Sequence, residues 1–178
     1  MMKRVTPQKS SEILMEICSQ SRVIPVLSVR EVEDSIPLAQ ALIEGGLNVL
    51  EVTLRTPNAL KVIEEMSTVK GSIVGVGTLL NRKDVENAVE VGAVFGVSPG
   101  ITDDILGACA DYGLPLLGGV SSISEIMKML DRGYCLLKFF PAEVSGGVKA
   151  LEAIGGPIPQ ALFCPTGGVS SENMKDYL

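Results

Sequence analysis

The chain of 178 residues contains no histidine and no tryptophan, and it has only four cysteines. Without histidine, Cys/His zinc sites and all Ser-His or Cys-His nucleophile arrangements are excluded. Proton transfer therefore has to fall to a carboxylate, a lysine or a tyrosine. The cysteines lack paired spacing, which favours free thiols and no metal site. They are Cys18, Cys109, Cys135 and Cys164.

The chain also has little positive charge and no long apolar run. Fifteen basic residues against 21 acidic residues give a net charge of −6, the wrong sign for a protein that binds a phosphate backbone. No apolar run approaches the roughly 20 residues that span a bilayer. Residues 1–21 show no extended apolar region of the kind found in export signals. We therefore expect no nucleic-acid partner, no membrane partner and a cytoplasmic location.

A loose repeat of about one βα unit organises the sequence. Glycines that can end a helix in the left-handed conformation recur before short apolar runs. These glycines are Gly46, Gly71, Gly92, Gly113 and Gly133. The runs predict strands, most of them buried on both faces, at 23–29, 48–54, 72–78, 93–98, 114–117, 135–140 and 161–165. Helix starts are predicted at Thr56-Pro57, Asn81, Thr102 and Ser122.

Alternating strands and helices indicate a parallel sheet, either open and doubly wound or closed as a barrel. No G-x-G-x-x-G motif follows the first strand, and chemically capable residues recur at strand ends, which favours a (β/α)₈ TIM barrel. We expect one domain over residues 1–178. A helix at about 7–21 should cross the barrel's bottom through a stripe of apolar residues. The stripe is Ile13, Leu14, Ile17 and Cys18.

The sequence reaches only seven βα units, and Leu178 falls in what should be the seventh helix. We therefore expect a C-terminally incomplete barrel, with the eighth strand and helix absent from this chain. The first and seventh strands would then have exposed, unpaired edges.

Two charged residues interrupt apolar strands. Lys138 lies in the run from Tyr134 to Pro141, and Glu51 lies between Leu50 and Val52. Burial lowers the pKa of a lysine and makes its amine a nucleophile toward carbonyls. The alternatives are a strand-end lysine that extends to water and a structural ion pair of Glu51 with Arg55 or Lys138. Because side chains two apart share a face, both should point into one barrel mouth.

Further polar or glycine-containing segments follow other strands. Thr78 ends the third strand and Ser98-Pro99-Gly100 ends the fourth, although ordinary turn chemistry is an alternative explanation for either. Gly167-Gly168 follows the seventh strand, before a helix that should begin near Ser170.

These segments together resemble the 2-keto-3-deoxy-6-phosphogluconate (KDPG) aldolase family, which also acts as 4-hydroxy-2-oxoglutarate (KHG) aldolase. The resemblance runs from Val23 to the last residue through several motifs in order. They are Val23-Ile24-Pro25-Val26, Gly45-Gly46 leading to Leu50-Glu51-Val52-Thr53-Leu54-Arg55-Thr56, Gly75-Val76-Gly77-Thr78, Val97-Ser98-Pro99-Gly100, Lys138-Phe139-Phe140-Pro141-Ala142-Glu143 and Phe163-Cys164-Pro165-Thr166-Gly167-Gly168.

The resemblance implies a class I aldolase of the Entner-Doudoroff pathway that needs no metal or cofactor and is commonly a homotrimer. It would cleave KDPG to pyruvate and glyceraldehyde 3-phosphate, and KHG to pyruvate and glyoxylate. Lys138 would form the Schiff base and Glu51 would be the acid/base. The other implied roles are carboxylate binding by Arg55 and Thr78, pocket walls from Pro99 and Phe140, and phosphate binding by Thr166, Gly167 and Gly168.

Two alternatives stay open at this point. One is a phosphosugar-binding barrel without aldol chemistry, such as an isomerase or epimerase, against which the pairing of Lys138 with Glu51 and Arg55 argues. The other is an inactive truncated fragment, which the missing eighth strand supports. The preferred keto-acid substrate is not readable from the sequence, because stereochemistry at C4 depends on pocket shape.

Overall fold

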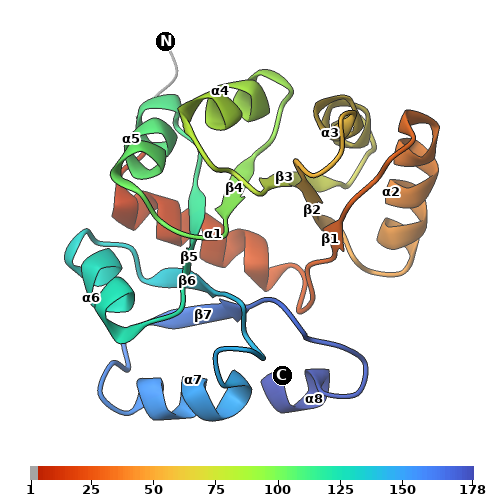
Figure 1. Cartoon of the computed structure of the whole chain (residues 1–178). Helices are drawn as coiled ribbons and strands as arrows, with labels where there is room; N and C mark the ends of the chain where they lie inside the picture. Colours follow the sequence, from red (N-terminus) through yellow and green to blue (C-terminus); the bar gives the residue numbers. More distant parts are fainter. Residues whose placement is uncertain (1–3) are drawn as a thin grey trace.

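Seven parallel strands form one sheet in chain order in this computed structural model, which describes residues 4–178. The sheet curls into an open barrel with helices around its outside (Figure 1). The strands are β1 (Val26–Leu27), β2 (Val49–Thr53), β3 (Ile73–Gly77), β4 (Phe95–Ser98), β5 (Leu116–Val120), β6 (Leu136–Phe139) and β7 (Leu162–Pro165). The helices are α1 (Pro7–Ser19), η1 (Val32–Asp34), α2 (Ser35–Glu44), α3 (Ala59–Ser67), α4 (Arg82–Glu90), α5 (Asp103–Tyr112), α6 (Ile123–Asp131), α7 (Gly147–Gly155) and α8 (Met174–Tyr177).

Each strand expected from the sequence is present, with corrections at β1 and β5. β1 is only two residues long because Pro25 supplies no N–H to the ladder and β1 pairs with β2 alone. β5 starts after Pro115 and continues to Val120, since its later residues pair with β6. β1 and β7 are not paired with each other among the described residues, and both are partly exposed. The prediction of burial on both faces is therefore wrong for these two strands.

The predicted helix boundaries are largely confirmed. All five glycines that should end helices have positive φ angles, between 69° and 93°. Asn81, Thr102 and Ser122 each cap a helix by accepting a backbone N–H, at 3.0, 3.2 and 3.4 Å respectively. The start expected at Thr56-Pro57 is wrong, because α3 begins at Ala59. The Thr56 hydroxyl instead donates to the carbonyl of Val29, 2.7 Å away.

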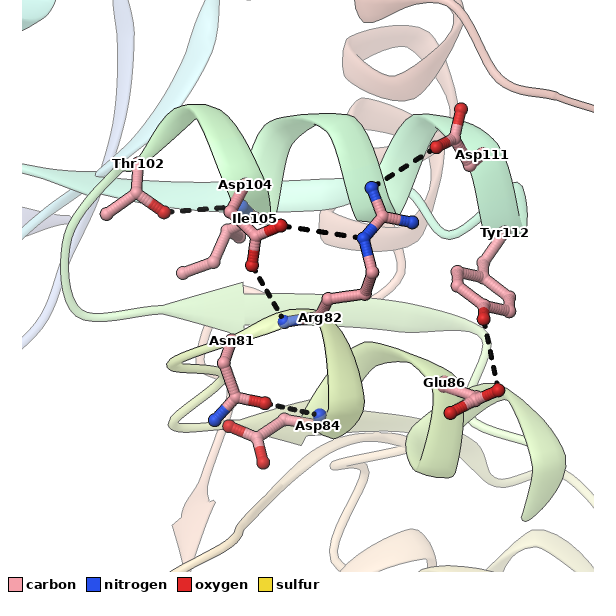
Figure 2. Close-up of polar contacts among 9 residues, drawn as sticks. All are labelled: Asn81, Arg82, Asp84, Glu86, Thr102, Asp104, Ile105, Asp111 and Tyr112. Atoms are coloured by element: carbon pink, nitrogen blue, oxygen red, sulfur yellow. Dashed lines mark hydrogen bonds and ion pairs between the residues drawn. The ribbon is translucent and has the colours of Figure 1, made fainter.

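Two of these caps lie where α4 and α5 run side by side on the outside of the barrel (Figure 2). Arg82 at the start of α4 pairs with Asp104 at 3.5 Å and with Asp111 at 3.3 Å, both on α5. Tyr112 donates to Glu86 at 3.1 Å. Arg82, Asp104 and Asp111 are solvent-exposed, so their ion pairs align the two helices with little effect on stability, while the bond of Tyr112 with Glu86 is half-buried.

Alternation along the strands divides the core into two clusters. Leu50 and Val52 of β2 pack outward, in the layer between the sheet and the helices. Val49 points into the barrel, in a smaller inner cluster. The inner cluster is Leu14, Ile17, Val49, Phe95, Val97, Leu117 and Leu136, with Ile13 and Cys18 packed against it. The apolar stripe of α1 thus covers the bottom of the barrel.

Two serines fix α1 to the sheet. The hydroxyl of Ser10 accepts the backbone N–H of Leu116 at 2.9 Å, and that of Ser11 accepts the N–H of Cys135 at 3.1 Å. Both serines are 1% exposed. Across residues 4–178, no helix combines the length and apolar character that crossing a membrane requires.

The buried bond of Ser10 yields the first prediction. Ser10→Ala leaves the N–H of Leu116 buried without a partner, which should lower the free energy of unfolding by about 1–3 kcal/mol. The matched control is Ser19→Ala, because Ser19 lies on the same helix, is exposed and bonds only the carbonyl of Glu16. We expect urea denaturation to show a change below about 0.5 kcal/mol for the control. Equal effects of both substitutions would contradict this role for Ser10.

Candidate active site

Glu51 and Lys138 reach the interior of the barrel from strands that are far apart in the sequence. Glu51 is the third residue of β2 and Lys138 the third residue of β6. Their neighbours along each strand pack outward, so alternation directs both charged side chains inward.

The two side chains meet in a buried pair. The Nζ atom of Lys138 lies 3.6 Å from Oε1 of Glu51, and each residue is only 4% exposed. Lys138 Nζ also lies 5.1 Å from the ring centroid of Phe140. The alternative that Lys138 extends to solvent is therefore wrong. The amine is held instead between a carboxyl group and an aromatic face.

Burial sets the protonation behaviour of Glu51. Desolvation raises the pKa of its carboxyl above the ordinary value of 4.5, and the charges of Lys138 and Arg55 oppose that rise only in part. A carboxyl with a raised pKa exchanges protons closer to neutral pH than an exposed one, as acid/base catalysis requires.

Arg55 and Thr78 follow the ends of neighbouring strands β2 and β3. Arg55 is exposed at the cavity mouth, and its guanidinium is close enough to Glu51 to affect the pKa of that carboxyl. Thr78 has a φ angle of 68°, in the left-handed region that a β-branched residue rarely adopts. Such strain persists where surrounding structure enforces it, and it gathers at functional sites.

Pro99 lies beside Gly119 of β5, the residue that pairs with Lys138. Gly119 pairs with Lys138 across β5 and β6, and a Cβ atom on Gly119 would lie 2.3 Å from the carbonyl oxygen of Pro99. Gly119 thus allows the loop after β4 to approach the lysine closely. Sequence reasoning missed this residue, although a glycine inside a strand signals close approach of another group.

Thr166, Gly167 and Gly168 form the turn after β7. The two glycines have φ angles of 99° and 82°. The carbonyls of Thr166 and Gly167 accept N–H groups of the segment after β6, at 2.8 and 3.1 Å. The helix expected near Ser170 is shorter than predicted and begins at Met174, because residues 171–173 form a turn.

A cavity of about 860 Å³ runs from this turn down the open side of the barrel. Five predicted site residues line it, namely Glu51, Arg55, Phe140, Thr166 and Gly167. Lys138 is not itself part of the lining, but it contacts two residues that are, Glu51 and Phe140. Thr78, Pro99 and Gly168 are not part of the lining. Inner-cluster side chains such as Phe95 and Leu136 form its lower wall.

Cys164 is a further residue of the site that sequence reasoning did not assign. It pairs with Lys138 across β6 and β7 and lines the cavity. Burial raises the pKa of its thiol to about 12, so the thiol stays protonated and unreactive beside the amine. The described residues hold no group of three or more His, Cys, Asp or Glu side chains arranged for a metal ion.

Comparison with known proteins connects this geometry to one family. The family model described as KDPG and KHG aldolase matches residues 14–178. The 2-dehydro-3-deoxy-phosphogluconate aldolase of Pseudoalteromonas atlantica is 52% identical over 92% of this chain and 76% of its own length.

Two solved structures are also similar. The KDPG aldolase of Zymomonas mobilis ZM4 with 3-phosphoglycerate has a TM-score of 0.91 at 43% identity, covering 94% of this chain and 80% of its own. The KDPG aldolase of Legionella pneumophila, with pyruvate captured at low pH as a covalent carbinolamine intermediate, has a TM-score of 0.88 at 43% identity, covering 98% and 82%. The chain therefore belongs to the KDPG and KHG aldolase family.

Proposed function

We propose that this protein is a class I aldolase that cleaves KDPG to pyruvate and glyceraldehyde 3-phosphate through a Schiff base on Lys138. One observation carries the proposal: the buried amine of Lys138 lies 3.6 Å from the carboxyl of Glu51, beside a cavity that reaches solvent. Membership in the aldolase family supports it. The phosphosugar-binding alternative gives no reason to bury an amine and a carboxyl together.

Lys138 carries the covalent chemistry in this proposal. Its neutral amine attacks the C2 ketone, and the carbinolamine that forms loses water to give a protonated imine. The imine then accepts the electron pair of the C3–C4 bond as the C4 hydroxyl loses its proton. The products are glyceraldehyde 3-phosphate and a pyruvate enamine. Protonation of the enamine at C3 and hydrolysis of the imine release pyruvate and restore the amine.

Glu51 moves the protons in these steps. Its carboxylate takes the proton of the C4 hydroxyl during cleavage, and its acid form supplies protons while the carbinolamine loses water. Both protonation states have to be accessible for this double role. The raised pKa of the buried carboxyl supports the assignment.

The remaining predicted residues have binding roles. Arg55, exposed at the mouth, presents forked donors that suit the planar pyruvate carboxylate, and Thr78 would hold the same group from β3. Phe140 forms a wall of the pocket beside the Lys138 amine. Pro99 would form a second wall, next to Gly119, which pairs with Lys138. The N–H groups of Gly167 and Gly168 would bind the 6-phosphate, with Thr166 in the same turn held by its own N–H, which donates to the carbonyl of Phe139 at 2.9 Å.

Four broader proposals accompany this one. The chain would also accept the keto acid KHG, and it would form a homotrimer, both by family resemblance. We place it in the cytoplasm, in keeping with four free cysteines, since disulfides are rare there. We also treat residues 1–178 as one domain, because the outer core cluster extends from β1 to β7.

Reductive trapping tests the function directly. Incubation with pyruvate and borohydride should add one reduced three-carbon unit to the intact protein, and peptide mass spectrometry should place it on Lys138. Lys138→Ala should abolish both the adduct and turnover. Lys61→Ala is the matched control, because Lys61 is a surface lysine of α3 that pairs only with Glu64 and Glu65. Absence of an adduct on the folded wild-type protein would refute aldolase function and favour a binding barrel or an inactive fragment.

The phosphate role predicts a substrate-dependent effect. Gly167→Ala introduces a Cβ atom at a φ angle of 99° and 3.3 Å from the Phe140 ring, which should distort the turn. Loss of one hydrogen bond to a charged phosphate should raise KM for KDPG by about 10- to 100-fold. KM for KHG, which has no phosphate, should change much less. Equal losses for both substrates in steady-state assays would contradict phosphate binding by this turn.

The raised pKa of Glu51 predicts a pH dependence of stability. Because the folded state holds this proton more tightly than the unfolded state, Glu51 contributes stability below its ordinary pKa of 4.5 and loses that contribution as pH rises through its folded pKa. The neutral variant Glu51→Gln lacks this titration. Urea denaturation should therefore show wild type losing stability relative to the variant as pH increases. A relative gain would mean that pairing with Lys138 outweighs burial.

A further inference from the structure

Gly77 lies directly against the carboxyl group of Glu51. It is the last residue of β3 and pairs with Thr53, two residues beyond Glu51 on β2. A Cβ atom on Gly77 would lie 2.3 Å from Oε1 of Glu51, 2.9 Å from its Cγ and 3.0 Å from its Cδ. The separations from Oε1 and Cγ are shorter than a van der Waals contact allows, and the separation from Cδ is at that limit. The carboxyl occupies the space that a side chain at position 77 would need.

The backbone of Gly77 does not itself require glycine. Gly77 does not have a positive φ angle, whereas the next residue, Thr78, does. An alanine is therefore compatible with the strand conformation at position 77. The obstacle is the end of one flexible side chain, that of Glu51.

Two other glycines near the site face different neighbours. A Cβ atom on Gly75 would lie 2.3 Å from the buried ring of Phe95, and one on Gly119 would lie 2.3 Å from the backbone of Pro99. Substitution at either position would disturb the core or a backbone segment. Of these three glycines, Gly77 is the one at which the nearest atom to an added Cβ belongs to a titratable side chain.

We propose that Gly77 is a positioning residue for the acid/base: its missing side chain keeps open the space in which the Glu51 carboxyl lies beside Lys138. The inference rests on the proposed roles of Glu51 and Lys138. The contact between the two groups is 3.6 Å, and an added methyl group has to displace the Glu51 carboxyl, so it changes the position of that carboxyl relative to Lys138. A misplacement of about 1 Å in a catalytic group lowers the rate by about 10²-fold.

The test is a double-mutant cycle between positions 77 and 51. Gly77→Ala should lower kcat for KDPG by about 10- to 100-fold, less than the full loss of an acid/base. In a Glu51→Ala background the side chain that clashes is gone, so the same substitution should change the residual rate by less than about twofold. Gly155→Ala is the matched control, because a Cβ atom there meets nothing within 4 Å. It should leave kcat unchanged.

The possible outcomes separate this inference from the proposed function. Unchanged kcat in Gly77→Ala, or an equal loss in both backgrounds, overturns the positioning role while wild type still traps pyruvate. If Gly77→Ala does not fold, the Gly77→Ala/Glu51→Ala variant should regain the Tm of Glu51→Ala, and failure to do so also overturns it. If wild type itself traps no pyruvate, both proposals fall together.

Discussion

The burial of one amine beside one carboxyl group is the constraint on which the site depends. Lys138 and Glu51 are each 4% exposed, and ionised groups removed from water are costly unless paired or neutralised. The protein meets this cost by raising the pKa of Glu51 and by placing the two groups 3.6 Å apart. Poor solvation also raises the pKa of the Glu51 carboxyl, which suits a group that exchanges protons. The same desolvation therefore has an energetic cost and a chemical use.

Parallel strands supply the precision that such a pair needs. Glu51 and Lys138 lie at equivalent positions of β2 and β6, with the outer core cluster fixing the strands from behind. Beneath the pair, α1 and the inner cluster fill the bottom of the barrel. Gly77 and Gly119 provide the missing volume that lets the carboxyl and the loop after β4 approach. The positions of the carboxyl and of this loop therefore depend on the absence of side chains at these two glycines.

The sequence predicted the strands, the helix-ending glycines and the central pair, because each depends on local pattern. Side chains along a strand alternate between the two faces of the sheet. This alternation was enough to predict that Glu51 and Lys138 both point into the barrel. The errors lie where tertiary contacts decide. Thr56 bonds Val29 instead of capping α3, and the helix expected near Ser170 starts at Met174. The role of Gly77 depends on a distance across two strands, which no local pattern contains.

Exchange of the pyruvate methyl protons with solvent deuterium tests the central claim most directly, because it requires the enamine and no phosphosugar. Proton NMR of pyruvate in D₂O should show rapid loss of the methyl signal with wild type. Lys138→Arg should show no exchange above background, and Glu51→Gln should show exchange slower by about 10²- to 10⁴-fold. Undiminished exchange in Glu51→Gln would contradict the account, since the carboxyl beside the amine would then have no part in moving protons.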